Sequence, residues 1–334
     1  MRQGWHGKRP RGYFAENLEP GCAHPAGFES NRMEMSEMSA PGANQGIDAI
    51  VLSFERLGYV TERSLATVVY LATHLGKPIL IEGHAGLGKT EAAKVLAAFL
   101  GTRLIRLQCH EGLDVNSAVY EWNYQKQLLA IKIQERSEQT VEEKERHIFS
   151  REFLLERPLL QSILADDAAP VLLIDEIDRA DEAFEAFLLE LLSDFQISIP
   201  ELGTVRAKLI PYVVLTSNRS RELSDALKRR CLYQWIDYPS LEKEMKIVRT
   251  RLPRIEEQLA GQVVRYVQAV RQLNLSKPPG IAETLDCAQS LLALGRQRLD
   301  SDGVEETLGC ISKSVEDTAK IRTAGVERIL SSAT

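Results

Sequence analysis

The hydrophobic positions change their spacing along the chain, and each change predicts a different element. Apolar residues recur at helical spacing over residues 65–75, which predicts a helix that ends at Gly76. The apolar run 78–81 then predicts a strand that is buried on both faces. An alanine-rich run over residues 92–100 predicts a second helix. The folded part of the chain is therefore expected to start with a helix, a strand and another helix.

Short apolar runs recur further along the chain and predict more buried strands. They cover residues 104–107, 171–174, 212–216 and 232–236. Apolar residues at helical spacing over 184–195 predict an amphipathic helix, and residues 197–205, with Pro200 and Gly203, predict a hairpin. Strands that alternate with helices in this way indicate an α/β domain.

The pattern divides the chain into three parts. Residues 1–45 lack periodicity and are rich in Gly, Pro, Ser, Asn and Met, so we expect a disordered N-terminal extension. Residues 46–238 would form the α/β domain. From residue 239 the spacing is helical throughout, which predicts an all-helical domain over 239–334. Residues 111–151 are irregular and then highly charged, and we expect a solvated helical insertion there.

Composition limits which partners the protein can bind and indicates the cellular compartment in which it works. The net charge of −6 gives no global basic field for nucleic acid. The five cysteines have no C-x-x-C spacing and no cluster with histidines, so we expect a reducing compartment without a zinc site or a disulfide framework. No apolar run approaches a membrane span, and no apolar core follows the basic N-terminal residues as a secretory signal requires. A cytoplasmic protein is expected.

The segment GHAGLGKT, between the first strand and the helix after it, fits the phosphate-binding pattern G-x-x-x-x-G-K-[ST]. Backbone N–H groups at a helix start suit phosphate oxygens, and glycines keep the loop thin. Lys89 would reach the β- and γ-phosphates of ATP, and the Thr90 hydroxyl would bind Mg²⁺. The expected nucleotide-binding residues are Gly83, His84, Ala85, Gly86, Leu87, Gly88, Lys89 and Thr90. The alternative is a glycine-rich turn before an ordinary helix. The chain has no N-K-x-D motif, which argues against GTP.

Two acids, Asp175 and Glu176, directly follow the apolar strand over residues 171–174. Ligands of parallel sheets gather at the carboxyl ends of the strands, so both carboxylates should face the phosphate loop. Asp175 would hold Mg²⁺ directly or through water, and Glu176 would orient and deprotonate the attacking water. The alternative is that the acids only cap the next helix. A nearby phosphate loop argues against this alternative, because the metal at such a loop needs a carboxylate.

Polar and basic residues on later segments complete the candidate site. Asn218 follows the strand over 212–216 and would hold the lytic water or a γ-phosphate oxygen; the alternative is a turn-forming asparagine. Lys228, Arg229 and Arg230 stand together before the last strand. An arginine from this group, offered to the γ-phosphate of a neighbouring subunit, would stabilise transition-state charge. The alternative is a solvated basic turn.

With the phosphate loop, LLIDEID, TSN and KRRC in this order, the chain resembles an AAA+ ATPase of the MoxR family. The longer stretches RLQCHEGLDVNSAVYEWNY, FEAFLLELLSDFQISIPELGTVRA and LSDALKRRCLYQWIDYPSLEKE resemble the CoxD-type subgroup, which is encoded beside carbon monoxide dehydrogenase and related molybdenum hydroxylases. The resemblance covers about residues 46–320. It implies a P-loop NTPase fold, with a five-stranded parallel sheet sandwiched by helices and followed by a helical lid.

The resemblance also implies roles for the candidate residues. The loop over residues 83–90 would be Walker A, Asp175 and Glu176 would form Walker B, and Asn218 would be sensor 1. Arg230 would be the arginine finger, with Arg229 as the alternative.

Other positions depart from the family or remain open. KPPGIAETLD stands where many relatives place a sensor 2 arginine, so Lys277 is only a weak substitute. Tyr59 and Val60 are the candidate adenine contacts.

The implied activity is that of an Mg²⁺-dependent ATPase ring, usually a hexamer, which acts as a chaperone-like remodeller. Its client would be a molybdenum hydroxylase that receives its metal cofactor, and a partner with a von Willebrand factor A domain is expected. One alternative is a DNA-directed AAA+ motor, against which the acidic balance argues. The other is a scaffold that binds ATP with little turnover, against which Glu176 argues.

Overall fold

The computed structural model describes residues 43–134 and 140–325. The N-terminal extension expected over residues 1–45 lies outside the described residues, apart from its last positions, which open helix α2 (Ala43–Arg56). Among the helices in these ranges, none has the length and apolar character needed to cross a membrane.

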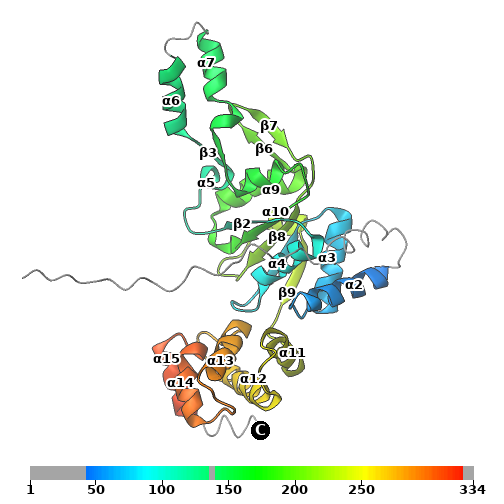
Figure 1. The fold of residues 1–334 in the computed structure, drawn as a ribbon, viewed down its shortest axis with the longest axis vertical. Coiled ribbons are helices and arrows are strands. Elements are labelled where there is room, and N and C mark those ends of the chain that lie inside the picture. The colour runs from blue at the N-terminus through cyan, green and yellow to red at the C-terminus, as the bar shows by residue number, and fades with distance from the viewer. Residues whose placement is uncertain (1–42, 135–139, 326–334) are drawn as a thin grey trace, which may run out of the picture.

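Within the described ranges, five parallel strands form the central sheet (Figure 1). Their order from edge to edge is β2 (Leu104–Gln108), β5 (Val171–Asp175), β8 (Tyr212–Ser217), β1 (Ile79–Gly83) and β9 (Leu232–Ile236). Every residue of β1 and β5 is buried, because strands inside a parallel sheet are covered on both faces. The predicted five-stranded parallel sheet is confirmed, and the carboxyl ends of its strands share one edge.

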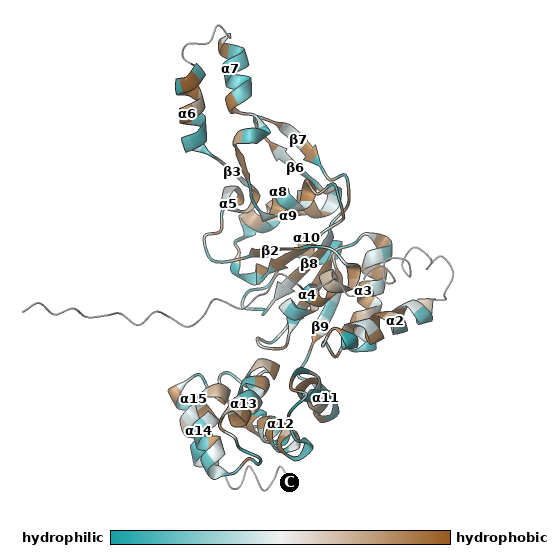
Figure 2. Cartoon of the chain, viewed as in Figure 1, coloured by the Kyte–Doolittle hydropathy of each residue, from teal (hydrophilic) through white to brown (hydrophobic). Residues whose placement is uncertain are grey.

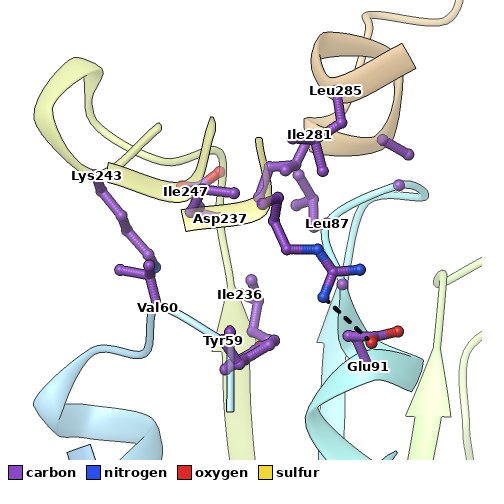
Figure 3. A pocket seen from close by; sticks show the side chains of 15 residues that line it. Tyr59, Val60, Leu87, Glu91, Ile236, Asp237, Lys243, Ile247, Ile281 and Leu285 are labelled. Atoms are coloured by element: carbon purple, nitrogen blue, oxygen red, sulfur yellow. Dashed lines mark ion pairs between the residues drawn. The ribbon is translucent and has the colours of Figure 1, made fainter. Parts of the chain in front are cut away.

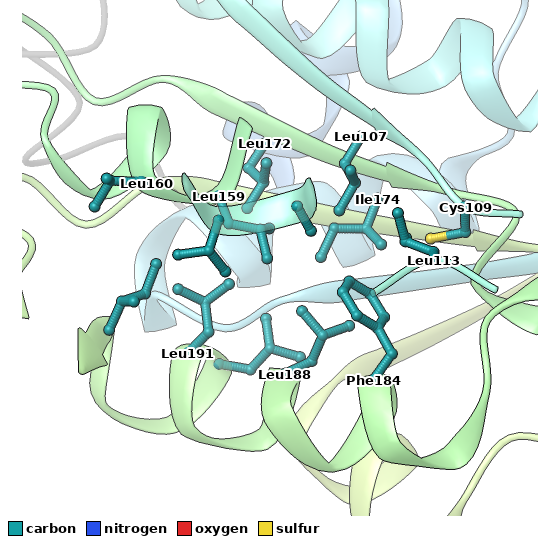
Figure 4. Packing of buried hydrophobic residues seen from close by; sticks show 14 of the residues in the cluster. Leu107, Cys109, Leu113, Leu159, Leu160, Leu172, Ile174, Phe184, Leu188 and Leu191 are labelled. Carbon is teal, nitrogen blue, oxygen red and sulfur yellow. The ribbon is translucent and has the colours of Figure 1, made fainter. Parts of the chain in front are cut away.

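Helices cover both faces of this sheet. One layer holds α2, α3 (Arg63–Leu75) and α4 (Lys89–Leu100), and the other holds α8 (Pro158–Ile163) and α9 (Glu182–Asp194). Successive strand residues face opposite layers, so Ile81 packs in the first core and Leu80 in the second. In Figure 4, Ile174 of β5 lies across from Phe184 and Leu188 of α9. The sheet is therefore held rigidly between two apolar layers, with its carboxyl edge available for a site.

A protruding insertion joins β2 to β5 (Figure 1). Its elements are α5 (Val115–Val119), β3 (Tyr120–Trp122), α6 (Tyr124–Gln134), α7 (Val141–Ile148), a 3-10 turn (Arg151–Phe153) and β4 (Leu154–Glu156). Helices α6 and α7 pack against each other, as expected for a helical insertion. However, α6 exposes the apolar side chains of Leu128, Leu129 and Ile133, and Figure 2 colours part of this helix as hydrophobic. The antiparallel pair β3–β4 differs from the irregular segment expected, because three-residue strands leave no readable period.

The predicted hairpin is confirmed as β6 (Gln196–Ile199) paired with β7 (Gly203–Arg206). It directly follows α9, so it extends the layer that carries the second core.

Five further helices follow β9 in the chain up to residue 325 and enclose a core of their own. They are α11 (Leu241–Arg251), α12 (Glu257–Arg271), α13 (Ile281–Ala293), α14 (Ser301–Ile311) and α15 (Val315–Ala324). Nη2 of Arg271 lies 2.6 Å from Oε1 of Glu244, and both side chains are buried. Loss of either partner would leave an uncompensated buried charge, so this pair locks α11 to α12.

Candidate active site

The loop between β1 and α4 has the backbone conformation that its glycines predict. Gly86 and Gly88 have φ angles of 75° and 81°, a region where a side chain is strained. Gly83 lies so close to β9 that a Cβ atom there would stand 2.3 Å from the Ile236 carbonyl oxygen. The first turn of α4 leaves its N–H groups without helical partners. Residues 83–90 thus offer free N–H groups and a positive helix end to an anion.

The Lys89 ammonium lies against this loop. Its Nζ donates to the carbonyl oxygens of Gly83 and His84, at 2.8 and 2.6 Å. Burial lowers the pKa of Lys89, and nearby carboxylates, Asp178 first among them, oppose that shift. The loop and its neighbouring acids therefore hold a lysine where a phosphate chain would lie.

Asp175, the last residue of β5, accepts hydrogen bonds from neighbouring elements on each side. Its Oδ1 accepts from the Thr216 hydroxyl of β8 at 2.5 Å and from the Thr90 hydroxyl of α4 at 2.9 Å. Its Oδ2 accepts from Nε and Nη2 of Arg106 on β2, at 3.0 and 2.6 Å. Asp175 is only 2% exposed, so these donors replace its hydration. The carboxylate joins α4, β8 and β2.

Thr90 and Asp175 fit the Mg²⁺ site that the sequence predicts. The Thr90 hydroxyl gives its proton to Asp175, so its oxygen lone pairs remain for a cation. In the part of the chain that the structure describes, no three His, Cys, Asp or Glu side chains group as a metal cage. Mg²⁺ in nucleotide sites takes few protein ligands and completes its shell with phosphate oxygens and water. A hydroxyl beside a buried carboxylate is a donor set of that kind.

Glu176 follows Asp175 in a strained backbone conformation. Its φ and ψ are 55° and 49°, a left-handed conformation that costs a non-glycine residue about 1–3 kcal/mol. Its N–H donates to the Thr216 hydroxyl at 2.9 Å, and its Oε2 lies 3.0 Å from Nε of Arg179. The side chain is 33% exposed, so water has access to the carboxylate. The turn directs this second acid away from the buried position of Asp175.

Asp178 organises the segment that holds Asn218, a role that the sequence analysis missed. Its Oδ1 accepts from the Asn218 N–H at 3.2 Å, and its Oδ2 accepts from the N–H and hydroxyl of Ser220, at 2.8 and 2.6 Å. Asp178 is 3% exposed. It ties the end of β8 to the end of β5, so Asn218 and Glu176 are held on neighbouring strands. Its place in LLIDEID, two residues after Glu176, was the available signal.

The predicted arginine residues lie on a short helix, α10 (Asp225–Arg230), and their contacts differ. Arg230 donates from Nε to the Ser193 hydroxyl of α9 at 2.6 Å and from Nη1 to the Ala226 carbonyl oxygen at 2.9 Å. Arg229 is exposed and has no hydrogen bond or ion pair within residues 43–134 and 140–325. The side chain of Arg230 is thus bonded to its own subunit, and that of Arg229 is free.

A cavity of about 220 Å³ adjoins the phosphate loop on the side of the C-terminal helices (Figure 3). Tyr59 and Val60, the candidate adenine contacts, both line it, together with Ile236 and Ile281. An apolar cavity that opens on a phosphate loop suits the base and sugar of a nucleotide. The adenine contact stays a prediction, which this placement supports.

The C-terminal helices reach the phosphate loop through backbone and not through Lys277. The Ala282 N–H at the start of α13 donates to the Gly86 carbonyl oxygen at 3.1 Å. Lys277 does not line the cavity. Arg251 does, and its guanidinium lies 3.6 Å from the carboxylate of Glu91, which also lines the cavity; a dashed line marks this ion pair in Figure 3. The structure therefore does not bring the suggested sensor 2 substitute to this cavity.

Comparison with known families places the site in context. Residues 78–231 match the family described as the AAA domain, dynein-related subfamily. The matched segment contains the phosphate loop, Asp175, Glu176, Asn218 and both arginine residues of α10. Comparison with curated proteins gives no match.

Solved structures that are similar include Thermotoga maritima RuvB, described as a Holliday junction branch migration motor. Its identity is 18% and its TM-score 0.40, covering 80% of this chain and 67% of RuvB. Two variants of the same protein match with 18% and 20% identity and TM-scores of 0.42 and 0.43. They cover 80% and 74% of this chain, and 68% and 67% of theirs. A likeness of this strength says nothing about activity or partner.

The sheet, the phosphate loop and the two acids at its carboxyl edge agree with the domain match. Residues 78–231 are an AAA domain with the P-loop AAA+ fold, and the protein is an ATP hydrolase.

Proposed function

We propose that this ATP hydrolase is Mg²⁺-dependent and acts as a hexameric ring that remodels a protein client in the cytoplasm. The observation that carries the proposal is the distribution of charge. Lys89 and the acids Asp175 and Glu176 converge at the phosphate loop, whereas Arg230 bonds to α9 and Arg229 is exposed. The free side chain of Arg229 is available to the nucleotide of a neighbouring copy, and that of Arg230 would become so on leaving Ser193, so the site would be shared between subunits.

The position of each residue suggests its role. When bound, Mg²⁺ would neutralise phosphate charge and orient the β- and γ-phosphates. Thr90 and Asp175 would hold the ion, and the Lys89 ammonium would pair with phosphate oxygens. Glu176 would accept the proton of the attacking water through the carboxylate oxygen that Arg179 leaves free.

Asn218 would hold the water or a γ-phosphate oxygen, and Asp178 would be its positioning residue. A neutral amide at this point would not neutralise the Glu176 carboxylate, which has to accept the proton. The Asp178 carboxylate is the acceptor for two N–H groups of the Asn218 segment. Displacement of a catalytic group by about 1 Å can cost roughly 10²-fold in rate.

Asp178→Ala should therefore lower kcat by about 10²-fold and change nucleotide affinity by only a few-fold. Steady-state phosphate release and titration with a fluorescent nucleotide measure the two effects. Asp181→Ala is the matched control, because Asp181 caps α9 by accepting from the Phe184 N–H. That variant should lose about 1 kcal/mol of stability and keep its turnover. Unchanged turnover in Asp178→Ala would refute the positioning role.

The arginine residues of α10 provide a test of the shared site. An arginine supplied in trans contributes about 10³–10⁵ in rate, so specific activity should rise with protein concentration. The resemblance favours Arg230 as the finger, and exposure favours Arg229. Alanine at the true finger should remove nearly all hydrolysis and keep ATP affinity, while alanine at the other should change the rate by only a few-fold.

Steady-state rates for Arg229→Ala and Arg230→Ala, measured across protein concentrations with mass determination in solution, decide the assignment. Activity that is independent of concentration in a demonstrated monomer would contradict the ring.

The client is proposed from the resemblance to CoxD-type proteins: a molybdenum hydroxylase of the carbon monoxide dehydrogenase kind, engaged with a von Willebrand factor A domain partner. The net charge of −6 supports a protein client rather than DNA. The exposed apolar side chains of α6 also suit contact with a protein.

Purified hydroxylase without its metal cofactor should gain activity when it is incubated with the ATPase, ATP and a cofactor source. Glu176→Gln, which should bind ATP without turnover, is the control and should give no gain. No ATP-dependent gain, combined with retention on duplex DNA at physiological salt and a steep salt slope, would instead indicate a DNA motor. Phosphate release that does not exceed the amount of enzyme would indicate a scaffold.

A further inference from the structure

We propose that Arg106 is a counter-cation on Asp175 that sets the Mg²⁺ requirement for nucleotide binding. The inference rests on the proposed Mg²⁺-dependent function. It concerns a residue that belongs to neither the phosphate loop nor the two acids, and it makes Arg106 a residue that acts on the metal through Asp175, by opposing its charge.

The strand pattern brings Arg106 to this place. In β2 the side chains of Ile105 and Leu107 point into the α9 core, so Arg106 between them faces the opposite layer, where α4 lies. Strand β2 is an edge strand beside β5. Its Arg106 is therefore 49% exposed, although the carboxylate that it reaches on Asp175 is only 2% exposed.

The contacts divide the carboxylate between two kinds of donor. Oδ1 receives the hydroxyls of Thr90 and Thr216, at 2.9 and 2.5 Å. Oδ2 receives both Nε and Nη2 of Arg106, and the Thr90 hydroxyl lies 3.2 Å from it as a longer second contact. Nη2 of Arg106 also donates to Gln108 on the same strand, which holds the guanidinium beside Asp175. The Arg106 guanidinium thus already balances the negative charge of Asp175, the carboxylate that accepts the Thr90 hydroxyl.

A guanidinium and Mg²⁺ at the same carboxylate repel each other and share one negative charge. Mg²⁺ must therefore bind against Arg106 or move it outward, and the half-exposed side chain has a route to solvent. The same positive charge attracts a triphosphate when no metal is present. Arg106 should weaken Mg²⁺ binding and strengthen metal-free nucleotide binding.

The opposite effects on Mg²⁺ binding and on metal-free nucleotide binding distinguish this role from a purely structural one. If Arg106 only stabilised the buried carboxylate, its loss would loosen the site and weaken both binding events. If it acts as a counter-cation, its loss strengthens one and weakens the other.

The experiment follows binding of a non-hydrolysable fluorescent ATP analogue to the full-length chain, in EDTA and during titration with Mg²⁺. Arg106→Gln should lower the Mg²⁺ concentration for half-maximal binding by roughly five- to tenfold. It should raise the Kd in EDTA by a similar factor. Arg106→Lys keeps a cation but loses the two-donor contact, so it should shift both values in the same directions as Arg106→Gln and by a smaller factor.

Arg103→Gln is the matched control and should change neither value, because Arg103 is also exposed and its side chain, among the residues that the structure describes, hydrogen-bonds only to the Gln161 carbonyl oxygen. Arg106→Met gives a second neutral variant, and thermal melting confirms that each variant is folded. If Arg106→Gln weakens nucleotide binding in both conditions, or changes it in neither, the role assigned to Arg106 is wrong. The proposed ATPase function would not be affected by that result. A wild-type chain that binds no analogue under any condition would overturn the proposed function as well.

Discussion

The buried carboxylate of Asp175 is the interaction on which the site depends. Its charge must be balanced inside the protein, and its donors come from α4, β8 and β2. The helix after the phosphate loop is thereby tied to the strands that carry the other proposed catalytic groups. A shift of any of these elements would move the Thr90 hydroxyl relative to the acids, so this hydrogen-bond set determines where a metal and a phosphate chain can lie.

Charges at this edge of the sheet are paired within the subunit. Asp175 faces Arg106, and Glu176 faces Arg179. Backbone strain marks the same region, because the non-glycine residues Glu176 and Arg219 both have positive φ at strand ends. Strain of this kind persists only where the surroundings hold it, and here the anchors are Thr216 and Asp178. A cation for the transition state is the component that α10 would offer to a neighbouring copy.

Much of this architecture could be predicted from the sequence. The strands inside the sheet are continuous apolar runs, and the phosphate loop and the acids of β5 stand at their carboxyl ends. Arg106 could not be found in this way, because its role depends on β2 lying next to β5, and strand order leaves no trace in periodicity. Asp178 was missed because its partners lie about 40 residues away. The bond between Arg230 and Ser193 likewise exists only after α9 and α10 pack together.

The central claim, that one chain supplies most of the site and a second copy completes it, is tested most directly by mixing two inactive variants. One carries Glu176→Gln, and the other carries Arg229→Ala with Arg230→Ala. Where the arginine residues of the first subunit meet the intact Glu176 of the second, a complete site forms, and roughly a quarter of the interfaces in an equal random mixture are of this kind. The account predicts that co-assembled mixtures hydrolyse ATP although neither variant does alone. A co-assembled mixture as inactive as its components would contradict it.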